Sequence, residues 1–276
     1  DYVRTVSLQA PIPDMMQVFS GEVDAVIFLK PFRRLMWAAW RVGIPLRVAT
    51  GFRWQSVLAN RWIYEHRSSF RKHESECNVE MLKGLRLKPL PVTSPVLRLT
   101  DEERNEGANR WSAGPAQRVV IHPGGVSARR WRPEHYRDLA NVLAHQGHAV
   151  VLTGSESERN SFQAEALAGS TLHRGVSSLM GELSVRALMG VIASAHAVVS
   201  GATGPAHVAA ALNIPTVSLF DPRRNNLPTR WKPLGRGVLL RPDVPTCEKC
   251  IGDACPFWDC LDRFTVKAVA SRVAGV

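Results

Sequence analysis

Several features are missing from this sequence, and each absence narrows what the protein can be. No uninterrupted apolar run approaches the ~20 residues that a membrane-spanning helix requires, and no secretory signal is recognisable. No recognisable nucleic-acid-binding module accompanies the strongly basic composition. We therefore expect a cytoplasmic protein that does not bind nucleic acid. The first residue is Asp1 rather than Met, so we expect the native chain to begin upstream.

The composition is otherwise that of a globular protein. Its 276 residues are 45% hydrophobic and 21% charged, which is enough chain for one large or two modest domains. The net charge of +11 is uneven: residues 1–100 hold 15 Lys and Arg against 8 Asp and Glu, while residues 101–276 hold 20 against 16. This excess favours either an anionic partner, such as a phosphorylated substrate or a membrane surface, or a solvated basic surface that serves solubility alone.

Short apolar runs alternate with amphipathic segments along the chain, which predicts βαβ units and a parallel sheet. The strands predicted from this pattern are 24–29, 46–49, 118–122, 149–153, 197–200 and 216–220. The predicted helices are 32–42, 72–87, 133–146, a helix that begins near Glu158, 184–194 and 205–212. The stretch 88–117 lacks periodicity, so we expect domains at 1–95 and 118–276 joined by a linker at 96–117.

Polar loops follow three strands of the second half, at the strand ends where parallel α/β sheets bind ligands. The first of these loops has the sequence HPGGVSARRWRP. Gly124 and Gly125 allow close approach of the backbone to a ligand, and Ser127 and Arg129 offer donors to phosphate oxygens. A loop with two glycines is a weak signal when it stands alone.

The second and third loops add complementary chemistry. In TGSESER, Glu156 or Glu158 either accepts hydrogen bonds from ribose hydroxyls or only supplies negative charge at a helix start. In GATGPAH, Thr203 and Gly204 precede a helix start that suits a phosphate, and His207 lies in its first turn. An ordinary crossover with a surface histidine explains this third loop equally well. Together the three loops favour an anionic, nucleotide-like ligand bound without a metal.

Four of the five cysteines cluster near the end of the chain, at Cys247, Cys250, Cys255 and Cys260. Their C-x2-C-x4-C-x4-C spacing has the ligand count of a structural Zn²⁺ site. Free structural thiols are the alternative, because disulfides are disfavoured in the cytosol.

A basic, aromatic helix is predicted at FRRLMWAAWR, residues 32–41. Such a helix either rests on anionic lipid or acceptor phosphate, or packs its tryptophans inward and leaves its arginines solvated. We expect the second arrangement, with Trp37 and Trp40 in the core.

The order of these motifs resembles the bacterial heptosyltransferases, glycosyltransferase family 9, whose members build the inner core of lipopolysaccharide. The resemblance covers most of residues 119–276 and rests on HPGG with RRW, TGSESER, TGPAHVAAAL and the cysteine cluster. It implies an α/β, GT-B architecture of two Rossmann-like domains with parallel sheets. The amino-terminal domain is expected to be incomplete here.

The resemblance also implies an activity. Heptose would pass from ADP-heptose to the lipopolysaccharide inner core with inversion, and no cofactor would be required. The carboxyl-terminal domain would hold the nucleotide-sugar donor, and the amino-terminal domain an acidic, phosphorylated glycolipid acceptor. The enzyme would lie peripherally on the cytoplasmic face of the inner membrane.

Matching positions assign donor-binding roles to individual residues. The roles are phosphate or sugar contact for Gly125 and Arg129, ribose contact for Glu156 or Glu158, adenine contact for Leu183, and diphosphate contact for Thr203, Gly204 and His207.

Two departures from the family pattern affect the expected activity. Ala202 stands where the family often has Asp, and the family's amino-terminal strand and Gly-Asp loop, which supply the catalytic base, do not occur in this sequence. No catalytic residue is therefore named. The alternatives are another nucleotide-sugar transferase, an epimerase-like GT-B protein, or a non-catalytic nucleotide-sugar-binding relative.

Overall fold

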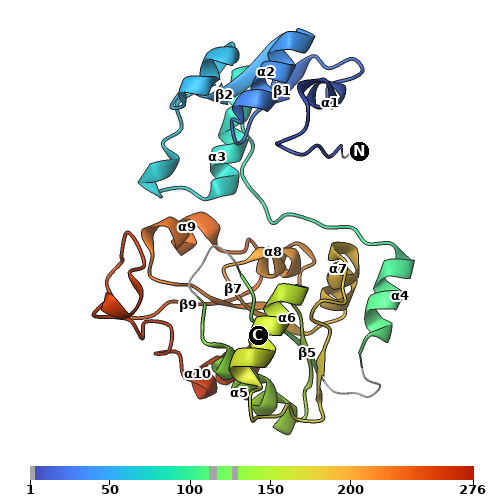
Figure 1. Cartoon of the computed structure of the whole chain (residues 1–276), viewed down its shortest axis with the longest axis vertical. Helices are drawn as coiled ribbons and strands as arrows, with labels where there is room; N and C mark the ends of the chain where they lie inside the picture. Colours follow the sequence, from blue (N-terminus) through green and yellow to red (C-terminus); the bar gives the residue numbers. More distant parts are fainter. Residues whose placement is uncertain (1–3, 112–116, 126–129) are drawn as a thin grey trace. The chain divides into compact units, whose positions relative to one another are not determined.

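The computed structural model describes residues 4–111, 117–125 and 130–276 and divides into two compact units (Figure 1). Unit 1 is Asp1–Val92 and unit 2 is Thr93–Val276. Each unit is built on a parallel sheet. The α/β class predicted from the alternation of strands and helices is therefore confirmed.

Unit 1 carries a three-stranded sheet in the order β1-β2-β3. Its elements are α1 (Ile12–Gln17), β1 (Ala25–Ile27), α2 (Arg33–Val42), β2 (Leu46–Thr50), the 3-10 helix η1 (Trp54–Leu58), β3 (Arg61–Ile63), the 3-10 helix η2 (Arg67–Ser69), α3 (Glu74–Glu80) and the 3-10 helix η3 (Met81–Leu85). Its apolar cluster joins buried side chains of α1, α2 and β2, among them Met15, Met36 and Ala49.

Two predictions about unit 1 need correction. The single helix predicted at 72–87 is instead α3 followed by η3, where Gly84 packs so closely on Val48 of β2 that a Cβ atom would overlap it. Trp37 and Trp40 do not pack inward, because α2 buries Met36 and its two alanines against the core and leaves both tryptophans exposed.

Unit 2 carries a six-stranded sheet in the order β6-β5-β4-β7-β8-β9, with every neighbouring pair parallel. Its elements are α4 (Asp101–Asn109), β4 (Arg118–His122), α5 (Pro133–His145), β5 (Ala149–Leu152), α6 (Glu156–Ala166), β6 (Val176–Ser178), α7 (Val185–Ala193), β7 (Ala197–Gly201), α8 (Gly204–Ala211), β8 (Thr216–Leu219), the 3-10 helix η4 (Arg224–Asn226), α9 (Pro228–Trp231), β9 (Gly237–Leu240), the 3-10 helix η5 (Gly252–Ala254) and α10 (Val266–Val273).

The sheet of unit 2 is buried on both faces. Along β4, Val119 and Ile121 belong to an apolar cluster with α5 and α10, while Val120 belongs to a second cluster with α7. A parallel strand that is covered on both sides reads as a continuous apolar run, which is what residues 118–121 show. The chain builds outward from β4 first to β5 and β6, and then to β7, β8 and β9. The strand order therefore reverses between β4 and β7.

The stretch predicted as a linker, 96–117, contains α4, which packs on α7. The two helix backbones meet at Gly107 and Gly190, where a Cβ atom on either residue would overlap the opposite backbone. Arg186 of α7 adds an ion pair to Glu103, with 2.6 Å between Nε and Oε1. Gly107 is the buried residue of α4, so the helix carries no apolar periodicity that the sequence could reveal.

None of the helices in the described part of the chain has the length and apolar content needed to span a bilayer.

Candidate functional site

The candidate site lies at the carboxyl edge of the unit 2 sheet, where the loops after β4 and β7 flank the reversal of strand order. In open α/β sheets this switch point is where ligands bind. The two loops touch: Gly125 has φ +140°, and a Cβ placed on it would lie 2.7 Å from Cγ2 of Thr203. The structure therefore brings together two residues that the sequence assigned to separate phosphate-binding loops.

The glycine loop after β4 is held by Glu158 of α6. One carboxylate oxygen of Glu158 accepts the Gly125 N–H at 2.8 Å. The other accepts the Ser155 N–H at 2.7 Å and the Ser155 hydroxyl at 3.0 Å, and Ser155 caps the helix in return. Gly124 is packed so closely on this carboxylate that a Cβ atom would overlap it. Glu158 is one of the two residues predicted to contact the ribose. In the structure its carboxylate instead accepts hydrogen bonds from the backbone of Gly125 and Ser155.

Glu156, the other acidic residue of this turn, has a different environment. Its side chain is 74% exposed and pairs with Arg159 at 3.1 Å, one turn along the same helix. The two glutamates therefore differ sharply, although the sequence left the ribose-contact role open between them.

Behind the glycine loop lies a buried histidine that the sequence did not single out. Nδ1 of His122, at the end of β4, lies 3.1 Å from Oγ1 of the fully buried Thr153. Burial lowers the pKa of His122, although the charge of Glu158 opposes this. Burial raises the pKa of Glu158, but hydrogen bonds from Ser155 and Gly125, together with His122, outweigh it, so the pKa lies below its ordinary value.

The start of α8 follows directly after the contact between the two loops. Its N-cap, Thr203, makes no capping hydrogen bond with its side chain, and its hydroxyl lies 2.8 Å from Oγ of Ser200. Gly204 is exposed, and a Cβ on it would meet no atom of the described residues within 4 Å. His207 follows in the first turn and is half-buried. An uncapped helix start of this kind presents backbone N–H groups and positive potential to an anion.

Of the other predicted site residues, the structure describes Leu183. Leu183 is half-buried, precedes the N-cap of α7, and packs against the apolar cluster of that helix. Ser127 and Arg129 lie outside the described residues, so their roles remain predictions.

The loop after β8 contains an acidic residue that sequence analysis missed. Asp221 is buried and accepts the Arg223 N–H at 2.9 Å, the Arg223 guanidinium at 2.8 Å and the Asn226 amide at 3.1 Å. An acid at the carboxyl end of a strand, two residues before an arginine, is the signal that could have identified it.

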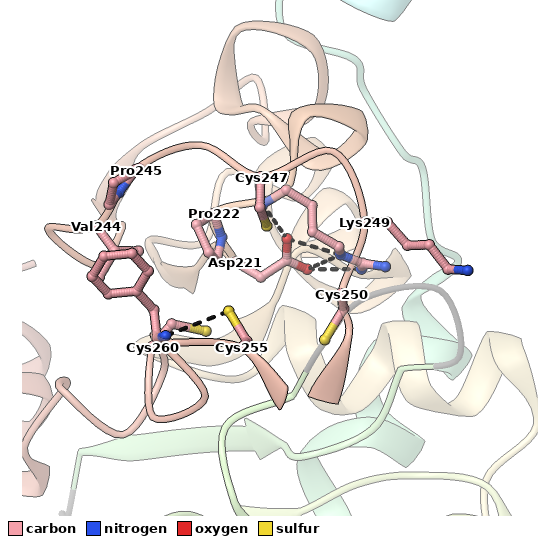
Figure 2. A pocket seen from close by; sticks show the side chains of 11 residues that line it. Asp221, Pro222, Val244, Pro245, Cys247, Lys249, Cys250, Cys255 and Cys260 are labelled. Carbon is pink, nitrogen blue, oxygen red and sulfur yellow. Dashed lines mark hydrogen bonds and ion pairs between the residues drawn. The ribbon is translucent and has the colours of Figure 1, made fainter. Parts of the chain in front are cut away.

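Asp221 also lines a small pocket together with the four clustered cysteines (Figure 2). No disulfide joins any of the five cysteines, all of which the structure describes. In the described part of the chain, no three His, Cys, Asp or Glu side chains are arranged to hold a metal ion. Burial raises the pKa of Cys247, and nearby Asp221 adds to this. The geometry therefore gives the predicted zinc site no support.

Comparison with known proteins gives a consistent result. Residues 18–257 match the family described as "Glycosyltransferase family 9 (heptosyltransferase)". A putative glycosyltransferase of Haemophilus influenzae is 29% identical over 216 residues, which is 71% of this chain and 59% of that protein. Lipopolysaccharide heptosyltransferase 2 of Escherichia coli is 31% identical over 138 residues, which is 49% of this chain and 40% of that protein. The chain thus spans about half the length of these relatives.

A solved structure shows the same fold. That of the E. coli ADP-heptose lipopolysaccharide heptosyltransferase II superposes with a TM-score of 0.73 at 22% identity, covering 96% of this chain and 78% of that one. The predicted GT-B class, with two Rossmann-like parallel sheets, is confirmed by this likeness and by the two sheets of three and six strands.

Proposed function

This chain belongs to glycosyltransferase family 9, the heptosyltransferases, and from this premise we propose its reaction. We propose that it transfers a heptose from ADP-heptose to the inner core of lipopolysaccharide, with inversion. A glycosyltransferase of the lipopolysaccharide heptosyltransferase type is what family membership itself supports. The donor, the acceptor and the stereochemistry belong to the proposal. The name of the E. coli protein of similar fold specifies ADP-heptose and is the source of the proposed donor.

One observation carries the donor site: the loops after β4 and β7 meet at the switch point beside an uncapped helix start. Gly125 and Thr203 are in close contact there, and a Cβ on Gly204 would meet no atom of the described residues within 4 Å. A diphosphate seated at this point would meet backbone N–H groups and the positive end of the α8 dipole. The two carboxylate oxygens of Glu158 accept the backbone N–H groups of Gly125 and Ser155, an arrangement that we call the Glu158 clamp. The clamp keeps the glycine loop in its conformation before the donor arrives.

The proposed mechanism needs little chemistry from unit 2. A base removes the proton of an acceptor hydroxyl, whose oxygen then attacks the anomeric carbon as the bond to ADP breaks. Negative charge develops on the leaving diphosphate, and fixed N–H donors at the α8 start stabilise it without reorganising. The base is not assigned to a residue of this chain.

The remaining parts of the proposal concern location and partners. We assign the donor to unit 2 and the acidic, phosphorylated glycolipid acceptor to unit 1. The enzyme would work at the cytoplasmic face of the inner membrane, where such an acceptor is presented.

The test is a calorimetric binding panel followed by a transfer assay. ADP-heptose is expected to bind, with UDP-sugars and GDP-sugars much weaker, and to be turned over with a lipid A–Kdo acceptor. Nuclear magnetic resonance of the product reads the anomeric configuration. Tighter binding of a UDP-sugar would indicate a different transferase or an epimerase-like protein. Donor binding without turnover on any acceptor would indicate a non-catalytic relative.

A further inference from the structure

Unit 1 has an exposed surface that donor binding does not use. Its apolar members are Trp37 and Trp40 of α2, Trp54 and Val57 of η1, and Trp62 of β3, and we call this surface the tryptophan face. Trp54 is 72% and Val57 is 73% exposed. In unit 2, Trp111 and Trp131 are buried in the core, while Trp258 is 52% exposed.

The elements of this face are joined to one another by direct contacts. Helix α2 packs on η1, and the Gln55 side chain of η1 donates to the Pro31 carbonyl, just before α2, at 3.0 Å. Trp62 donates its indole N–H to the Ser56 carbonyl of η1 at 2.8 Å. The elements that carry these exposed side chains, α2, η1 and the start of β3, are therefore neighbours in the fold of unit 1.

The charge of this region is one-sided. Between Asp24 and Glu65 the chain has seven Lys and Arg and no acidic residue. Two of the seven serve the fold: Arg34 donates to the Ala10 carbonyl at 2.6 Å, and Arg47 donates to the Leu58 carbonyl at 2.9 Å.

Three other cations border the tryptophans. Arg33 and Arg41 lie on the same stripe of α2 as Trp37, at intervals of four residues, and Arg53 directly precedes η1. All three are exposed, and within the described residues none has an ion pair to a carboxylate.

We propose that the tryptophan face binds the surface of an anionic phospholipid bilayer. Indole rings prefer the boundary between headgroups and acyl chains, and arginines beside them attract anionic headgroups. The exposed aliphatic side chain of Val57 also favours this occupant, because the boundary with the acyl chains accommodates an aliphatic side chain as well as an indole. The proposal takes from the proposed function only that the acceptor is membrane-borne, and it requires no donor binding or turnover.

The test is co-sedimentation of the full chain with vesicles that contain no acceptor. Phosphatidylethanolamine vesicles containing phosphatidylglycerol are compared with phosphatidylcholine vesicles. The wild type is expected to bind the anionic vesicles and to be released by salt. Arg33→Gln with Arg41→Gln should lower the partition coefficient roughly 10- to 30-fold, at about 1 kcal/mol for each cation near the surface. The matched control is Lys267→Gln with Arg272→Gln, two exposed cations of α10, which should have no effect.

A second pair of variants tests the apolar contribution. Trp54→Ala with Val57→Ser should weaken binding, while Trp258→Ala with Val185→Ser, on comparably exposed residues of unit 2, should not. Thermal melts check that each variant folds. If Trp54→Ala with Val57→Ser does not fold, that variant is replaced by a measurement on the wild type, the quenching of tryptophan fluorescence by brominated phosphatidylglycerol. An absence of quenching counts against the proposal.

Several outcomes would overturn the proposal. These are equal binding to both kinds of vesicle, an equal loss in the control variants, no vesicle binding by the wild type, binding to RNA or DNA instead, or self-association that the tryptophan-face variants abolish. Calorimetry with ADP-heptose on the same preparations shows separately whether the donor site, and with it the proposed function, stands.

Discussion

The clamp formed by Glu158 makes a prediction that can be worked out atom by atom. Each of its two carboxylate oxygens accepts a backbone N–H, one from Gly125 and one from Ser155. Glutamine has the same shape but a single acceptor oxygen. In Glu158→Gln, one of these two N–H groups must therefore face an NH₂ group, which cannot accept a hydrogen bond.

The expected cost follows from the loss of a charge-assisted bond at a partly buried site, about 1–3 kcal/mol of unfolding free energy. For a unit of this size each kcal/mol corresponds to roughly 2–4 °C in Tm. ADP affinity should fall as well, because the glycine loop loses one of its two anchors. Urea unfolding and calorimetric titration with ADP measure the two effects.

Glu156→Gln is the matched control. It makes the same chemical change two residues away, at a side chain that is 74% exposed and, among the described residues, forms an ion pair with Arg159. An exposed ion pair of this kind contributes about 0–1 kcal/mol. The clamp account fails if the two variants unfold alike. A Glu158→Gln variant that weakens ADP binding with unchanged stability would instead support direct contact with the ribose.

Three further predictions follow from the described geometry. Burial lowers the pKa of His122, so the unfolded chain takes up a proton before the folded one, and the free energy of unfolding falls as the pH drops below about 6.5. His122→Asn should reduce this pH dependence between about pH 7 and pH 5 by at most ~1.4 kcal/mol per pH unit. An unchanged pH dependence of the unfolding free energy would count against the burial of His122. Gly107→Ala pushes α4 from Gly190 of α7 and should cost about 1–3 kcal/mol in urea unfolding, whereas an effect below about 0.5 kcal/mol would contradict this packing. At Gly204 an added Cβ meets no atom of the described residues within 4 Å, so Gly204→Ala should leave Tm unchanged and weaken ADP binding roughly tenfold by calorimetry; unaltered affinity would remove the phosphate from that position.

The sequence is most informative about unit 2, because its strands are short apolar runs buried on both faces. Arg118–His122 is predicted with its observed bounds for this reason. The helix at residues 101–109, α4, is not predicted, because it has no apolar face. It is charged all round and is held by a glycine contact with a segment some 80 residues away. No local pattern encodes such a contact.

The candidate site shows the same division. The loop glycines and the start of α8 are visible as turn chemistry, and the parallel sheet implies that their loops share an edge. Which partner each acid takes is a tertiary property. Glu158 contacts a loop 33 residues earlier, while Glu156 points to solvent, and the sequence shows both as acids in one helical turn. The exposure of Trp37 and Trp40 also depends on packing, because the alanines of α2 face the core in their place.

We place the donor diphosphate between the loop after β4 and the start of α8. Hydrogen–deuterium exchange of the full chain, with and without ADP-heptose, tests it most directly. We predict that protection on binding is concentrated at Gly124, Gly125 and the first turn of α8, with little change in the cysteine pocket or in unit 1. Protection centred on the cysteine pocket, or no protection of the α8 start under saturating ADP-heptose, would contradict this account.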